Sequence, residues 1–91
     1  MSEDTTSRLN PESWTPAFIE LAKQAITAAA SGEHDRALRS ADQLHRATAR
    51  LTNTVVAAAR RGGCSWSQIG GGLAMTKQSA WERFRHVDDE P

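Results

Sequence analysis

Six polar and aromatic side chains close to the C-terminal end combine hydrogen-bonding types that can recognise planar polar edges. They are Thr76, Lys77, Gln78, Trp81, Glu82 and Arg85. In the major groove of DNA, lysine and arginine donate to guanine, glutamine pairs with adenine, glutamate accepts from cytosine, and threonine or aromatic carbon packs on the thymine methyl group. If residues 76–86 form a helix, this set occupies its outward side. The spacing therefore predicts a helix that reads base edges.

A second set of residues surrounds the predicted reading helix and suits contacts with phosphate groups. Guanidinium groups, hydroxyls and the free N–H groups at the start of a helix bind phosphate oxygens without reading sequence. The expected set is Arg60, Arg61, Ser65, Trp66 and Arg83. Residues 60–86 carry five basic side chains and one acidic side chain, although the formal net charge of the chain is zero. The positive charge is therefore concentrated where this chemistry is predicted.

Two short helices joined by a tight turn are predicted to position both sets. Ser65 and Gln68 form the pattern of a capping box, which opens a helix to about residue 73, and Thr76 can cap a second helix to about residue 86. The positions that must face inward when two such helices cross are apolar or small: Ile69, Gly70, Leu73, Met75, Ala80 and Phe84. This pattern is typical of a helix-turn-helix.

Residues 58–85, AARRGGCSWSQIGGGLAMTKQSAWERFR, resemble a helix-turn-helix segment common in small bacterial regulators. The segment is also similar in outline to the promoter-reading domain of sigma factors. The matching residues are Ala59, Arg60, Gly63, Ser65, Trp66, Ile69, Gly70, Leu73, Met75, Thr76, Lys77, Gln78, Ala80, Trp81, Arg83 and Phe84. The resemblance covers under a third of the chain and implies DNA binding with residues 76–85 as the recognition helix. Ala74 stands where the family usually has glycine, and a positive φ there would cost about 1 kcal/mol.

Two longer helices are predicted upstream of this segment. Thr15 can cap and Pro16 can open a helix over residues 16–31, which Gly32 ends. No proline or glycine interrupts residues 35–61, so one long helix is expected there. Strand signals are absent. The predicted fold class is all-α, an N-terminal helical hairpin whose long second helix leads into a trihelical helix-turn-helix unit.

Small and apolar residues recur along the long helix at alternating steps of four and three. They are Ala37, Ala41, Leu44, Thr48, Leu51, Val55 and Ala58. This heptad pattern accepts another helix at close range, either the first helix folded back or the same helix of a second subunit. One short recognition helix contacts few base pairs, so a homodimer on two half-sites is expected. The expected dimerisation contacts are Ala37, Ala41, Leu44, Thr48 and Leu51.

The domain organisation follows from these elements. Residues 14–86 are expected to form one helical domain, with a hairpin and dimerisation part at 14–50 and a DNA-binding part at 51–86. Residues 1–13 lack periodicity and are expected to be disordered, and residues 87–91 form an acidic tail. No apolar run approaches the roughly 20 residues of a membrane span, and the polar N-terminus does not resemble a signal peptide. A cytoplasmic protein without a membrane partner is expected.

Three consecutive glycines, Gly70 to Gly72, raise the alternative of a phosphate-binding loop. A P-loop needs glycine directly before lysine and a preceding strand, and neither occurs here. Gly70 is expected to allow close crossing of the recognition helix. Gly71 and Gly72 each cost about 1 kcal/mol relative to alanine inside a helix. Either this helix is weak, or a DNA backbone or second subunit approaches too closely for a Cβ atom.

Catalytic and metal-ligating groups do not cluster in the sequence. His34, His45 and His86 share no ligand spacing, and no Ser/His/Asp grouping or carboxylate pair is evident. Cys64 lies in a turn near two arginines, where redox sensing is conceivable, but a lone turn cysteine is usually incidental. We therefore expect no enzyme activity, no cofactor, no metal and no small-molecule effector.

The expected function is sequence-specific binding of double-stranded DNA by a transcriptional regulator. The alternative is a protein interaction module that uses the long heptad helix without binding DNA. The zero net charge and the acidic tail favour that alternative, because many DNA-binding domains are strongly basic. Trp81 either faces the groove or turns back against Trp66 or the first helix.

Overall fold

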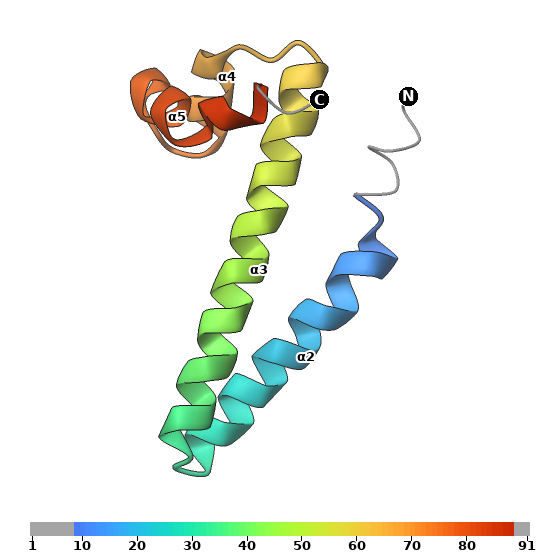
Figure 1. The fold of residues 1–91 in the computed structure, drawn as a ribbon, viewed down its shortest axis with the longest axis vertical. Coiled ribbons are helices and arrows are strands. Elements are labelled where there is room, and N and C mark those ends of the chain that lie inside the picture. Colours follow the sequence, from blue (N-terminus) through green and yellow to red (C-terminus); the bar gives the residue numbers. More distant parts are fainter. Residues whose placement is uncertain (1–8, 89–91) are drawn as a thin grey trace. The chain divides into compact units, whose positions relative to one another are not determined.

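The computed structural model describes residues 9–88, and the chain divides into two compact units, Met1–Leu51 and Thr52–Pro91. The described residues form four α-helices and a short 3-10 helix, with no strand among them, so the predicted all-α class is confirmed. The elements are α2 (Pro11–Ala30), α3 (His34–Arg61), α4 (Trp66–Gly72), α5 (Lys77–Phe84) and η1 (Arg85–Asp88) (Figure 1). Helix α3 contributes to both units. The boundary between the units falls one residue from the predicted division after residue 50.

Helix α2 begins five residues earlier than predicted. Asn10 is the N-cap, and its side-chain oxygen accepts a 3.0 Å hydrogen bond from the N–H group of Glu12. Pro11 stands in the first turn, and Pro16 lies inside the helix. The predicted start at Pro16 was wrong because the sequence Asn-Pro-Glu supplies a cap, a first-turn proline and a first-turn acid further upstream. Residues 11–13, which were expected to be disordered, are helical, whereas residues 1–8 lie outside the described part of the chain.

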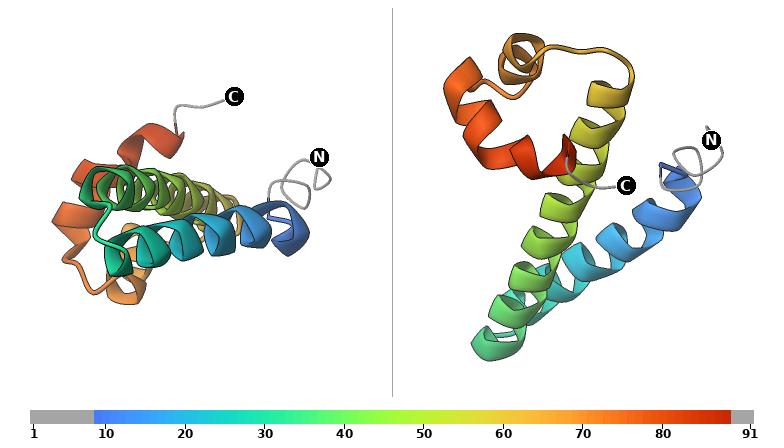
Figure 2. Two further views of the ribbon diagram at one scale, coloured as in Figure 1. Left: turned by 90° about the horizontal axis from the view of Figure 1, so that it is seen from below. Right: turned by 45° about the horizontal axis from the view of Figure 1, so that its top comes forward.

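A tight turn at residues 31–33 connects α2 to α3 and makes a helical hairpin of unit 1. Gly32 has a φ of +78°, and its N–H group donates to the carbonyl of Ala29. The predicted glycine therefore ends the first helix in the left-handed conformation. Helix α2 and the first half of α3 are antiparallel on the two sides of this turn (Figure 2).

The face that α3 buries in unit 1 differs from the predicted seam. Ser40 and Ala47 are 5% exposed, and Leu44 is half-buried, whereas Ala41 and Thr48 are exposed. The residues with reduced exposure are Ala37, Ser40, Leu44, Ala47 and Leu51. They follow steps of three and four but include two positions outside the predicted seam. Ala41 and Thr48, which belong to the predicted seam, lie outside this buried stripe, whereas Ser40, which the predicted seam omits, lies inside it because its side chain is small enough to be buried in a helix contact.

Unit 2 is built from the last turns of α3, the two short helices and η1. One buried cluster joins these elements: Val56, Ala57, Ile69, Ala80, Phe84 and Val87. Half-buried Trp66 and Met75 pack against it. Two expectations are corrected here. Leu73 is 37% exposed rather than inward, and Val87, expected in the acidic tail, is 8% exposed because η1 carries it into the core.

Candidate nucleic-acid interface

A capping box opens α4, the first helix of the candidate site. The hydroxyl of Ser65 accepts a 3.1 Å hydrogen bond from the N–H group of Gln68. In return, the N–H group of Ser65 donates to Oε1 of Gln68 at 2.7 Å. The predicted S-x-x-Q capping box is therefore present. The hydroxyl oxygen of Ser65 accepts in the cap while its O–H group is still able to donate, so the expected contact with phosphate is compatible with the start of α4.

The turn between α4 and α5 passes directly over Gly70. The N–H group of Met75 donates to the carbonyl of Gly70 at 2.8 Å. A Cβ atom on Gly70 would lie 2.8 Å from the carbonyl oxygen of Met75 and 3.0 Å from that of Thr76. Glycine is needed at this position because the backbone of the turn leaves no room for a Cβ atom. The predicted close approach of the segment leading into α5 to α4 at Gly70 is present.

Ala74 adopts the strained conformation that the family resemblance implied for this position. Its φ is +57°, and it is the one non-glycine residue between positions 9 and 88 with a positive φ. An alanine in this region costs about 1 kcal/mol relative to glycine. Two turn hydrogen bonds flank this conformation, from the N–H group of Ala74 to the carbonyl of Gly71 and from the N–H group of Met75 to the carbonyl of Gly70.

Gly71 and Gly72 have no packing role within the described residues. Both are exposed, and a Cβ atom on either would meet nothing within 4 Å. Space within the chain would allow alanine at both positions. The two explanations from the sequence, a weak α4 or close approach of another molecule, therefore both stay open.

Helix α5 has one anchored face and one exposed face. Thr76 caps it, with its Oγ1 accepting a 3.0 Å hydrogen bond from the N–H group of Ser79. Ala80 and Phe84 are 0% and 2% exposed and hold the helix on the unit 2 core. All six predicted base-reading residues are exposed: Thr76, Lys77, Gln78, Trp81, Glu82 and Arg85. The first five belong to α5 and its cap, and Arg85 begins η1.

The exposed side chains of α5 are ordered by contacts among themselves. Nε2 of Gln78 donates to Oε1 of Glu82 at 3.0 Å. The guanidinium carbon of Arg85 lies 4.9 Å from the centre of the Trp81 ring, which is a cation–π distance. Trp81 is 39% exposed and pairs with Arg85. Trp66 has a different partner, the guanidinium of Arg60, at 4.6 Å.

Arg60 is held by three partners within unit 2. Its Nε and Nη2 atoms donate to the carboxylate of Asp88 at 3.1 and 3.0 Å, and its Nη1 donates to the carbonyl of Cys64 at 3.0 Å. Its guanidinium group also lies over the ring of Trp66. Arg60 thus links the end of α3 to η1 and to the start of α4. Its charge is compensated by Asp88, which the sequence analysis had assigned to a separate acidic tail.

The remaining members of the predicted phosphate set are divided between surface and core. Arg61 and Arg83 are exposed, and the guanidinium carbon of Arg83 lies 5.2 Å from the Phe84 ring centre. Trp66 is half-buried against the unit 2 core. Arg61 and Arg83 are therefore the exposed members of the set, and neither forms an ion pair within residues 9–88, whereas Arg60 and Trp66 are built into the unit.

Other kinds of site find no support in the part of the chain that the structure describes. No group of three or more histidine, cysteine, aspartate or glutamate residues within 9–88 is placed to hold a metal ion. Cys64 is half-buried and packs against the unit 2 core. Over the same residues, no helix combines the length and apolar character needed to cross a membrane.

Comparisons of this chain with known protein families, with curated proteins and with solved structures found no match.

Proposed function

We propose that this chain binds double-stranded DNA with α5 in the major groove and regulates transcription by occupying an operator. The observation that carries the proposal is the two-sided character of α5. Ala80 and Phe84 fix one side of the helix to a small core, and the other side exposes lysine, glutamine, tryptophan and glutamate. These types recognise base edges. A rigidly held helix with such a face meets the requirement for direct readout.

The dimensions of α5 agree with this role. Its 8 residues give a length of about 12 Å. The major groove is about 12 Å wide and admits one helix. A helix of this length reaches only a few base pairs, so a second reading helix on a half-site roughly 34 Å away would supply useful specificity. Homodimerisation is therefore part of the proposal.

Two kinds of arginine have different tasks in this proposal. Arg61 and Arg83 are exposed and serve as phosphate contacts, which orient α5 but read no sequence. Arg60 acts as a positioning residue, because its bonds to Asp88 and Cys64 hold α4 and η1 beside α3. The task needs no cofactor and no catalytic group. In a bacterial cell it would be carried out in the cytoplasm.

A protein interaction module remains the second candidate function. It is favoured by large apolar side chains on the surface of unit 1, where Ile26 is 69% exposed and Leu38 is 68% exposed. Such residues favour a protein partner when they form a continuous patch. This alternative predicts no salt-dependent retardation of any DNA duplex.

Selection of binding sites from random duplexes, followed by affinity measurements at several salt concentrations, tests the proposal. Gln78→Ala is expected to lose about 1–3 kcal/mol on the selected site and little on random DNA. Gln24→Ala is a matched control, because Gln24 forms a comparable bond to Glu20 on α2. If no duplex is enriched, or if Gln78→Ala binds every duplex as the parent does, the proposed docking is wrong.

A further inference from the structure

Unit 1 leaves several of its large apolar side chains uncovered. Within its described residues, the buried positions are Ala28, Ser40 and Ala47, all of them small. Ile19 and Ile26 on α2 are 50% and 69% exposed. A helix is stable in water when its apolar stripe is covered by another element. The hairpin by itself does not meet this condition.

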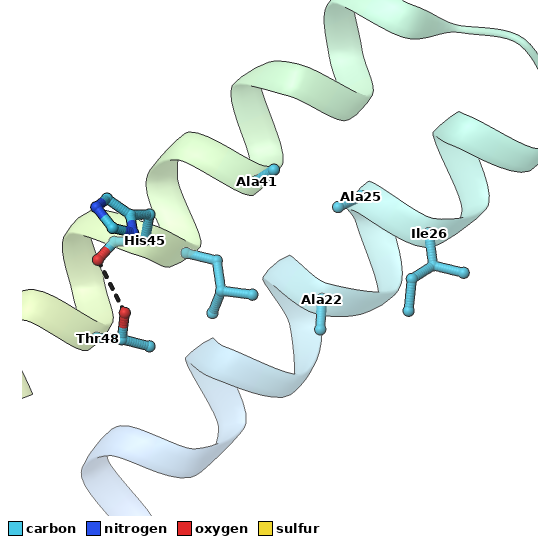
Figure 3. A pocket seen from close by; sticks show the side chains of 7 residues that line it. Ala22, Ala25, Ile26, Ala41, His45 and Thr48 are labelled. Atoms are coloured by element: carbon cyan, nitrogen blue, oxygen red, sulfur yellow. Dashed lines mark hydrogen bonds between the residues drawn. The ribbon is translucent and has the colours of Figure 1, made fainter. Parts of the chain in front are cut away.

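An open groove of about 410 Å³ lies between α2 and α3 on this unit (Figure 3). It is lined by Ala22, Ala25, Ile26, Ala41, Leu44, His45 and Thr48. Ala25 and Ala41 point toward one another across it, and Ile26 projects beside it (Figure 3). None of the lining residues is an aspartate, glutamate, lysine or arginine. The groove is therefore suited to an apolar partner.

Exposed positions and half-buried Ala22 repeat at helical spacing beside the groove on both helices. On α2 the stripe is Ile19, Ala22, Ile26 and Ala29, and on α3 it is Ala41, His45 and Thr48. Steps of three and four residues are the pattern that a helix presents to another helix in a bundle. We name these seven residues the hairpin face. It offers two parallel stripes, so it can accept two further helices.

We propose that the hairpin face binds the hairpin face of a second copy of this chain, forming a four-helix bundle. Ile26 of each copy would enter the groove of the other. A twofold interface must carry a projection and a matching recess on one and the same patch. Here Ile26 supplies the projection, and the alanines at 22, 25 and 41 supply the recess. This self-complementarity selects a second copy as the occupant.

The hairpin face is small. Along α2 it runs from Ile19 to Ala29, 11 residues or about 16 Å, and two adjacent helices are each about 10 Å wide. The face therefore offers about 320 Å² per copy and about 640 Å² in total, the size of a weak and reversible interface. The dimer interface rests on the proposed function in one respect only, namely that its purpose is to bring two reading helices together on DNA. The interface itself lies on unit 1 and is measurable without DNA.

Sedimentation equilibrium of the full chain without DNA tests this interface. The parent is expected to dimerise reversibly at about 10–500 μM. Ile26→Glu is expected to weaken dimerisation by about 100-fold or more, because each interface loses two buried isoleucines. Leu38→Glu is the matched control, since Leu38 is equally exposed but does not line the groove. It is expected to change the dissociation constant by less than about threefold.

A second variant distinguishes loss of the dimer interface from misfolding of the chain. Ala41→Leu fills the groove from its own chain, and it is expected to weaken the dimer while circular dichroism stays helical, because Ala41 is exposed. A monomeric parent, or a dimer that Ile26→Glu and Ala41→Leu both leave intact, overturns the inference. A dimer that selects no DNA sequence contradicts the proposed DNA binding alone. A monomer that binds its operator contradicts dimerisation and the interface and leaves DNA binding by α5 standing.

Discussion

Unit 1 and unit 2 differ in what their helices bury. Unit 2 keeps Val56, Ile69, Phe84 and Val87 at 8% exposure or less. In unit 1 the buried described residues are alanines and one serine, and Ile26 stays 69% exposed. Two helices in contact enclose only the small residues between them, whereas three or more helices surround a large side chain on several sides. Unit 2 therefore has a hydrophobic core of its own, whereas unit 1 buries only small residues between its two helices.

The largest expected effect tests the unit 2 core directly. Phe84→Ala should lower the free energy of unfolding by about 3–5 kcal/mol, because Phe84 is 2% exposed and its removal leaves a cavity. Leu38→Ala in unit 1 should change it by about 0.5 kcal/mol or less, since Leu38 is already 68% exposed. Urea unfolding of both variants measures the contrast. Similar losses at the two positions would mean that the units do not differ in packing.

The next effect concerns the turn that positions α5. Gly70→Ala should destabilise the protein by about 1–3 kcal/mol, because the new Cβ would lie 2.8 Å from the carbonyl oxygen of Met75. That oxygen belongs to the backbone and can move only if the turn moves. DNA binding should weaken as well, since the start of α5 follows the turn. Thermal unfolding and a mobility-shift titration check the two consequences, and an unchanged melting temperature would contradict the first.

Glycines 71 and 72 provide the matched comparison within the same helix. Gly71→Ala and Gly72→Ala should each stabilise the protein by about 0.5–1 kcal/mol, because neither Cβ meets an atom within 4 Å. The double variant also separates the two explanations for these residues. Normal DNA binding by a more stable protein indicates that α4 is intrinsically weak. Loss of binding by a stable protein indicates that a DNA backbone or a second subunit approaches α4 closely.

The smallest effect compares one ion pair in each unit. Asp88→Asn should cost about 0.5–1 kcal/mol of stability, the upper end for an accessible pair, because Asp88 accepts from two nitrogens of Arg60. Asp42→Asn removes the more exposed 2.9 Å pair with Arg46 and should cost about 0.5 kcal/mol or less. Urea unfolding at low and high salt measures both. Equal losses would mean that the pairs are equivalent despite their different surroundings.

Predictions from the sequence were correct where the interacting residues lie close together in the chain. The range of α3, the capping box of Ser65 and Gln68, and the Thr76 cap were all predicted, because each depends on residues no more than four positions apart. The same approach misplaced the start of α2, since two sets of start signals occur five residues apart and only one is used. Contacts between distant residues were not predicted. Nothing near Arg60 in the sequence identifies Asp88, 28 positions away, as its partner.

The sequence by itself determined the all-α class, the caps of α4 and α5 and the exposed polar set on α5, because these follow from backbone hydrogen bonding and from periodicity along one helix. Only the tertiary structure decided which stripe of α3 is buried, where Val87 lies and that Arg60 is already paired. A repeat of three and four residues allows several faces of a helix to serve as a seam. Packing against a neighbour selects one of them, and on unit 1 it leaves Ile26 and the groove beside it exposed.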